Sequence, residues 1–231
     1  VDNEEVDDLL LALEGELPGR RFGDEVRLEV DDTCPEDLRH FLRQQFDLGN
    51  DAVYQMNGPV NLGRLQAIHA LIDRPDLKWK PFAPGLPQGF IRDTSIFEIL
   101  DARDILLHHP FESFVPVVDM LRQAAADPKV LAIKQTLYRT GPDSALVDGL
   151  VEAARGGKEV TVIIELRARF DEAANIALAN RLHEAGAHVA YGVVGYKTHA
   201  KMLLVVRREA RGLRRYVHLG TGNYHQSTAR L

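Results

Sequence analysis

Hydrophobic positions in the first 72 residues recur at alternating helix-like and strand-like spacings. Residues 2–17 place valine and leucine three and four positions apart among acidic residues, which is typical of an amphipathic helix. Alternation over 26–30 predicts a strand, and Thr33 stands at an expected helix N-cap ahead of a helix through residue 46. A strand over 53–56 and a helix over 62–72 repeat the cycle. These patterns predict an α/β scaffold.

Proline and glycine interrupt the chain repeatedly between residues 75 and 89. Both residue types favour turns and end regular elements. We therefore place a domain boundary here, with a smaller α/β portion over residues 1–85 and a second domain over residues 86–231.

The second domain shows a regular rhythm of strand and helix. A strand-like apolar run at 105–107 breaks at the pair His108-His109. The pattern beyond it predicts helices over 117–126, 144–154 and 171–185 and strands over 130–136, 160–166 and 188–194. Strands separated by helices of this length indicate parallel β-α-β units. The segments around His199 and Tyr216 look like an appended hairpin, so the predicted fold class is α/β with a mixed, largely parallel sheet.

Composition limits the class of protein without identifying it. The 231 residues are 45% hydrophobic, and no apolar window approaches the roughly 20 residues of a membrane helix. The single cysteine, Cys34, excludes an internal disulfide and a cysteine-based zinc site and fits a reducing compartment.

The net charge of −6 conceals a basic C-terminal stretch, in which Glu209 is the only carboxylate from Lys197 to Leu231. We expect this stretch to meet a polyanion, and both ends to be cuts through a longer chain.

A histidine between two lysines is the first candidate for chemistry. Lys197, His199 and Lys201 are spaced two residues apart and lead into an apolar run. Side chains at positions i and i+2 of a strand share a face, so we expect the three to project together. A histidine on a buried strand is often only a satisfied core residue. A second cluster, His218-Leu219-Gly220-Thr221-Gly222-Asn223, weakens that alternative because its glycine turn can present N–H groups to an anion.

Arginines follow two of the predicted strands. Arg139 comes after the strand at 130–136, and Arg169 comes after the strand at 160–166. Ligands of open α/β sheets bind beyond the carboxyl ends of the strands, and guanidinium groups match phosphate oxygens. An exposed salt bridge is the alternative reading for either arginine alone.

The motifs that are missing narrow the chemistry. The sequence lacks Gly-x-x-x-x-Gly-Lys-Ser/Thr, Gly-x-Gly-x-x-Gly and Gly-x-Ser-x-Gly, so neither a common nucleotide loop nor a hydrolase elbow is indicated. The remaining residues suit phosphoryl transfer, because a neutral imidazole can attack phosphorus and pass the phosphoryl group on. Surrounding cations would disperse charge on the transferring group.

Part of this pattern resembles the phospholipase D superfamily. His199-Ala200-Lys201 and Gly220-Thr221-Gly222-Asn223 are similar to its His-x-Lys and Gly-Ser/Thr-x-Asn motifs. The aspartate expected five residues after the lysine is Val206 here. A phosphodiesterase or nuclease of this superfamily is therefore one alternative function, and a non-catalytic polyanion-binding module is another.

A wider set of blocks resembles the bacterial polyphosphate kinases. They cover most of residues 105–231 and include LHHPFESF from 107, AIKQTLYRT from 132, ARFDE from 168, YKTHAK from 196 and HLGTGN from 218. The resemblance implies that residues 1–85 are the later part of the head (middle) domain. It implies that residues 86–231 are the first of two facing phospholipase D-like domains, truncated at its end.

The same resemblance implies reversible transfer of the terminal phosphoryl group of ATP to inorganic polyphosphate through a phosphohistidine. His199 matches the phosphorylated histidine, with His218 and Lys201 as further catalytic residues. Lys197 and Asn223 are expected at the phosphate. Arg139 and Arg169 match positions that the family associates with Mg²⁺; since a guanidinium has no lone pair for a cation, we expect them to share phosphate oxygens with the metal.

The resemblance also sets expectations for the whole protein. Its partners would be ATP, ADP and polyphosphate, with no nucleic acid, in a homo-oligomer located in the cytoplasm or peripherally at the membrane. Because a second histidine and most nucleotide contacts are expected beyond Leu231, we expect the 231-residue chain alone to be weakly active or inactive.

Overall fold

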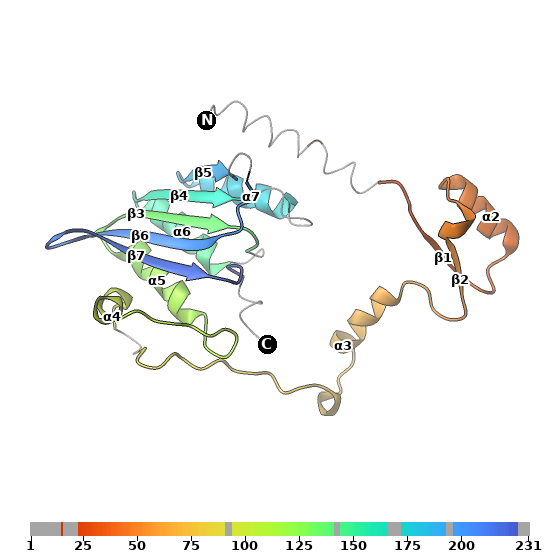
Figure 1. The fold of residues 1–231 in the computed structure, drawn as a ribbon, viewed down its shortest axis with the longest axis horizontal. Coiled ribbons are helices and arrows are strands. Elements are labelled where there is room, and N and C mark those ends of the chain that lie inside the picture. Colours follow the sequence, from red (N-terminus) through yellow and green to blue (C-terminus); the bar gives the residue numbers. More distant parts are fainter. Residues whose placement is uncertain are drawn as a thin grey trace. The chain divides into compact units, whose positions relative to one another are not determined.

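A computed structural model describes residue 15 and residues 23–90, 94–140, 144–165, 172–192 and 196–225. The chain divides into two compact units, one formed by Gly15–Lys80 and the other containing Pro81–Leu231. Figure 1 shows the elements of both. The helix predicted over 2–17 lies outside the described residues, apart from position 15.

The first unit contains a β-α-β arrangement, as the sequence predicts. Strands β1 (Leu28–Asp31) and β2 (Val53–Met56) pair in parallel, and helix α2 (Glu36–Gln45) connects them. The predicted N-cap at Thr33 is wrong, because the helix is capped at Pro35. The Thr33 amide and hydroxyl instead donate to the Asp31 carboxylate, which forms a local turn before the helix.

The helix predicted over 62–72 is only partly α-helical. It consists of the 3₁₀ helix η2 (Leu62–Ala67) followed by one α-helical turn, α3 (Ile68–Leu71). The short 3₁₀ helices η1 (Asn50–Ala52) and η3 (Pro75–Leu77) flank this region. Leu62, Leu65, Ile68 and Leu71 recur every three residues, which is the period of a 3₁₀ helix rather than that of an α-helix.

The second unit is built on a five-stranded mixed sheet with strand order β5-β4-β3-β6-β7. The strands are β3 (Val130–Leu137), β4 (Glu159–Ile164), β5 (His188–Tyr191), β6 (Lys201–Glu209) and β7 (Gly212–Gly220). Strands β3, β4 and β5 are parallel to one another, whereas β6 is antiparallel to β3 and β7 is antiparallel to β6. The predicted α/β class, with parallel β-α-β units and an appended hairpin, is confirmed.

Helices cover one face of this sheet and leave the other partly exposed (Figure 1). They are α4 (Ile96–Ala102), α5 (Val115–Ala126), α6 (Ala145–Arg155) and α7 (Glu172–Glu184). Val162, Gln135 and Leu203 are neighbours across β4, β3 and β6, and all three are buried. On the other face Val217 and Leu219 of β7 are exposed. The core therefore lies between the sheet and its helices.

Two further differences from the sequence prediction precede the sheet. Residues 105–107 form no strand; Leu106 is exposed and lies outside both sheets. Helix α4 was not predicted, although its buried Ile96, Phe97 and Ile99 have helical spacing.

Candidate active site

The end of strand β3 carries an aromatic ring around which most of the predicted cations gather. Tyr138 directly follows β3, and its ring centre lies 5.0 Å from the centre of the His199 ring in an edge-on arrangement. Lys197 Nζ and Lys201 Nζ lie 5.7 and 5.5 Å from the Tyr138 ring centre, and Arg139 Cζ lies 5.6 Å from it. These distances fall within the range of cation–π attraction. Tyr138 is thus the common neighbour of four predicted site residues.

His199 and Lys201 contact each other directly. The Lys201 ammonium nitrogen lies 3.0 Å from His199 Nε2. Since an ammonium group only donates hydrogen bonds, Nε2 is the acceptor and carries a lone pair. Burial lowers the pKa of Lys201, which is only 6% exposed, whereas the His199 side chain is exposed. In this structure the Nε2 lone pair of an exposed ring therefore accepts a hydrogen bond from a buried amine.

The predicted reason for this proximity is only partly correct. Strand β6 begins at Lys201, and residues 197–200 have no regular structure. Alternation along a strand therefore does not place Lys197 and His199. They approach the site because residues 196–200 pass close to the end of β3, where Tyr138 lies.

Two buried side chains fix the backbone on either side of His199. The Thr136 hydroxyl donates to the Ala200 carbonyl oxygen at 2.6 Å and accepts from the Met202 amide at 3.0 Å. Glu165, at the end of β4 and 5% exposed, accepts the Thr198 amide through Oε2 at 2.8 Å. The loop is thereby tied to two parallel strands, which restricts where the imidazole can lie.

Helix α7 joins the ends of the same two strands. The side-chain amide of Asn175 donates to the carbonyl oxygen of Tyr138 at 3.1 Å and to that of Glu165 at 2.9 Å. Asn175 is buried, so the two strand ends share one fixed partner. Sequence reasoning missed Thr136, Glu165 and Asn175. The position of Thr136 and Glu165 at or near strand ends was the only available signal, and Asn175, within α7, gave none.

His218 belongs to a separate buried cluster of rings. It lies on β7 opposite Leu203, and its Nδ1 is 2.9 Å from the Tyr224 hydroxyl. Ring contacts continue from Tyr224 to Phe114 and from Phe114 to His109. Within the described residues, no hydrogen bond or ring contact joins His218 to His199. The predicted catalytic histidines therefore occupy different environments.

Burial keeps the His218 imidazole neutral. Loss of water around the ring, helped by the nearby His109, lowers the pKa of His218 to about 4. The Nδ1–H group of His109 donates to the Glu112 carbonyl oxygen at 2.9 Å, while its Nε2 is buried and has no hydrogen-bond partner in the described structure. The neutral His218 ring therefore lies near a second imidazole whose buried Nε2 makes no hydrogen bond within the described residues.

The glycines of the turn after β7 are explained by space and not by backbone conformation. Neither Gly220 nor Gly222 has a positive φ, so left-handed backbone conformation is not the reason for these glycines. A Cβ atom at Gly220 would lie 3.2 Å from Cε1 of His218. Gly220 therefore leaves room for the imidazole. Beside the turn, Oδ1 of Asn223 is buried without a hydrogen-bond partner in the described part of the chain.

The arginine pair can be placed only in part. Arg139 is half-buried at the end of β3, whereas Arg169 lies outside the described residues.

Over the described ranges, no group of three or more His, Cys, Asp or Glu side chains is placed to hold a metal ion. Nor does any helix in these ranges have the length and apolar character needed to cross a membrane.

Comparison with known proteins matches this arrangement to one family. The polyphosphate kinase C-terminal domain 1 family matches residues 95–231, and the polyphosphate kinase middle domain family matches residues 1–68. The chain belongs to the polyphosphate kinase family. Its fold is similar to the crystal structure of polyphosphate kinase from Porphyromonas gingivalis, with a TM-score of 0.71 and 29% identity over 86% of this chain and 30% of that one.

Curated polyphosphate kinases match the chain along its whole length. Identity over 231 residues is 60% with the protein from Pseudomonas aeruginosa strain PAO1, 58% with that from Xylella fastidiosa strain 9a5c and 57% with that from Neisseria gonorrhoeae. In each case the chain covers 33–34% of the relative. It thus spans about one third of the length of these polyphosphate kinases.

Proposed function

We propose that the protein takes part in reversible transfer of the terminal phosphoryl group of ATP to inorganic polyphosphate, with His199 as the phosphoryl acceptor. The observation that carries this proposal is the exposed His199 imidazole, whose Nε2 lies 3.0 Å from Lys201 Nζ beside a group of cations. The family relationship supports the choice of reaction. The single cysteine is compatible with the cytoplasm as its location.

The first half-reaction forms a nitrogen–phosphorus bond. Once Lys201 gives up its hydrogen bond to His199 Nε2 and turns to the phosphate, the freed lone pair attacks the γ-phosphorus of ATP, and the bond from that phosphorus to the bridging oxygen breaks. ADP leaves with that electron pair. Lys201 and Lys197 then neutralise charge on the equatorial oxygens. In the second half-reaction a terminal oxygen of polyphosphate attacks the same phosphorus, and the bond to Nε2 breaks.

Other site residues have supporting roles in this proposal. Arg139 and Arg169 would contact phosphate oxygens of the substrate and not the metal itself, because guanidinium groups cannot ligate a cation. A Mg²⁺ ion on the same phosphate would offset part of its charge. The Asn223 amide lies at the turn after β7 and is a further donor to phosphate. His218 supports this turn as a neutral ring packed over Gly220.

The test is replacement of His199 in a polyphosphate kinase extended to the length of the curated relatives. His199→Ala should abolish acid-labile labelling by γ-³²P-ATP, because the accepting nitrogen is gone. His183→Ala is the matched control, since His183 is exposed on α7, away from the site residues, and it should label normally. Retained labelling in the His199 variant would refute the phosphohistidine at this position.

A further inference from the structure

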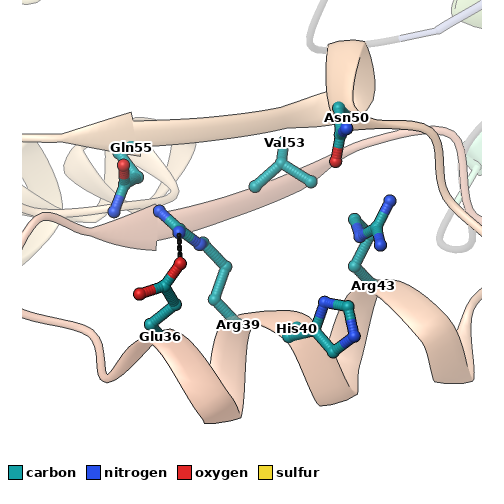
Figure 2. A pocket seen from close by; sticks show the side chains of 7 residues that line it. All are labelled: Glu36, Arg39, His40, Arg43, Asn50, Val53 and Gln55. Atoms are coloured by element: carbon teal, nitrogen blue, oxygen red, sulfur yellow. Dashed lines mark hydrogen bonds and ion pairs between the residues drawn. The ribbon is translucent and has the colours of Figure 1, made fainter.

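A polar hollow lies between helix α2 and strand β2 of the first unit (Figure 2). Its volume is about 340 Å³, at the lower end of the range for small-ligand sites. The residues that line it are mostly polar: Glu36, Arg39, His40, Arg43, Asn50 and Gln55. None of the site residues discussed above lines it.

Two arginines dominate the charge of this hollow. Arg39 and Arg43 are one helical turn apart on α2 and are both half-buried. In Figure 2 the Arg39 side chain extends towards β2 and Gln55, while Arg43 lies below Asn50. Like charges at this helical spacing repel each other. Proximity of the two groups is therefore unfavourable unless an anion lies between them.

The hollow contains too little negative charge of its own to balance the arginines. Glu36 is its only carboxylate; its side chain is 89% exposed and lies 3.4 Å from Arg39 Nη2. Within the described residues, Arg43 and His40 form no ion pair or side-chain hydrogen bond. Unused donors thus face a space large enough for a ligand.

Ordinary packing of a helix on a sheet does not account for this arrangement. An amphipathic helix usually buries its apolar stripe, yet Leu38 and Phe41 of α2 are 46% and 57% exposed while both arginines line the hollow. Attraction to the helix dipole favours Arg43, which is in the last turn. It does not explain Arg39, which lies earlier in the helix.

We propose that this hollow binds a short chain of condensed phosphate, with Arg39 and Arg43 on successive phosphate groups. Guanidinium forks contact phosphate oxygens through paired hydrogen bonds, and the Asn50 and Gln55 amides supply further donors. The identity of the anion rests on the proposed function; the site itself rests on the geometry of the hollow. The first unit would thereby have a polyphosphate contact of its own.

The experiment is an NMR titration of the 231-residue chain with inorganic tripolyphosphate at low salt, followed through the His40 ring signals. His40→Gln assigns these signals, which report on the hollow and not on His199. The chemical shifts of the His40 ring should change with tripolyphosphate concentration and reach a plateau. The double variant Arg39→Gln/Arg43→Gln should weaken binding by about tenfold or more, since two charge-assisted contacts are lost. Arg43→Lys, which retains charge but loses the fork, should weaken it less.

A charge-matched control separates a specific site from general attraction. The variant Arg64→Gln/Arg74→Gln removes two positive charges from the same unit, outside the hollow, and should change the affinity by less than about twofold. Equal weakening in both double variants, or an equal response to sulfate at the same ionic strength, would overturn the proposal. Tighter binding of ATP than of tripolyphosphate would assign a nucleotide instead and would also overturn it.

This outcome is independent of the His199 test. Loss of labelling in His199→Ala with no His40 response would reject the hollow and leave the proposed function intact. A His40 response together with normal labelling of His199→Ala would support an anion site in the hollow and reject the proposed phosphohistidine at His199.

Discussion

At the scale of single residues, the position of His199 depends on buried side chains that do not touch the substrate in the proposed mechanism. Thr136 and Glu165 hold the backbone before and after His199 through hydrogen bonds of 2.6–3.0 Å. Tyr138 provides the ring that the surrounding cations share. The His199 imidazole itself is exposed, so its position is set by these neighbours rather than by its own packing.

The titration of His218 gives a prediction at the same scale. Its pKa should be about 4, against the ordinary value of 6.5, because burial and the neighbouring His109 disfavour the charged ring. Two-dimensional NMR of the histidine ring signals, assigned with His218→Gln, measures this directly. A His218 titration near pH 6.5 would contradict the buried, neutral ring.

The same shift makes folding stability depend on pH. Between pH 6.5 and 4 the unfolded chain takes up a proton at His218 that the folded chain does not, so this contribution to stability is complete above pH 6.5 and falls as the pH falls. The loss should be on the order of 2–3 kcal/mol by pH 4. Urea unfolding of His218→Gln should show a shallower pH dependence over this range.

At the scale of elements, a charged network anchors the β6–β7 hairpin to neighbouring parts of its unit. Arg207 of β6 donates from Nε to Asp127 at 2.7 Å and also pairs with Glu209. The Tyr216 hydroxyl of β7 donates to Asp101 at 2.8 Å, and Arg214 pairs with the same carboxylate at 2.9 Å. Part of the basic charge noted in the sequence is therefore used within the fold.

Removal of Arg207 tests this anchoring. Arg207→Gln should lower the free energy of unfolding by about 2 kcal/mol, because two partly buried carboxylates lose their partner. Arg208→Gln removes the same charge from an exposed neighbour that has no ion pair within the described residues, so its effect should stay within about 0.5 kcal/mol. Urea denaturation compares the two; equal effects would show that the network adds nothing.

Most elements of the second unit, although not helix α4, could be predicted closely because they are long runs with a clear period. Strand β3 was expected over 130–136 and spans Val130–Leu137, since it begins with four apolar residues and most of its positions are buried. The hydrogen bonds of Thr136 and Glu165 could not be predicted in this way. Their partners lie 64 to 66 and 33 residues away in the sequence, respectively, and only the register of the sheet brings them together.

At the scale of the whole molecule, the described residues around His199 combine an exposed imidazole with several cations. The chain spans about one third of the curated polyphosphate kinases. In the described ranges, no group of three or more His, Cys, Asp or Glu side chains could hold a metal ion. The charge of the transferring group must be balanced from several sides for the reaction to proceed at a useful rate.

We therefore expect the 231-residue chain alone to turn over ATP very slowly, at less than about one hundredth of the rate of a chain extended to the relatives' length, because lost electrostatic stabilisation of this kind costs about two to three orders of magnitude. Formation of polyphosphate from ATP, measured for both chains at equal concentration, is the comparison. His199→Ala in the longer chain provides the background rate. Comparable turnover by the short chain would mean that residues 1–231 already hold a complete active site, and the arrangement around Tyr138 would then have to bind nucleotide unaided.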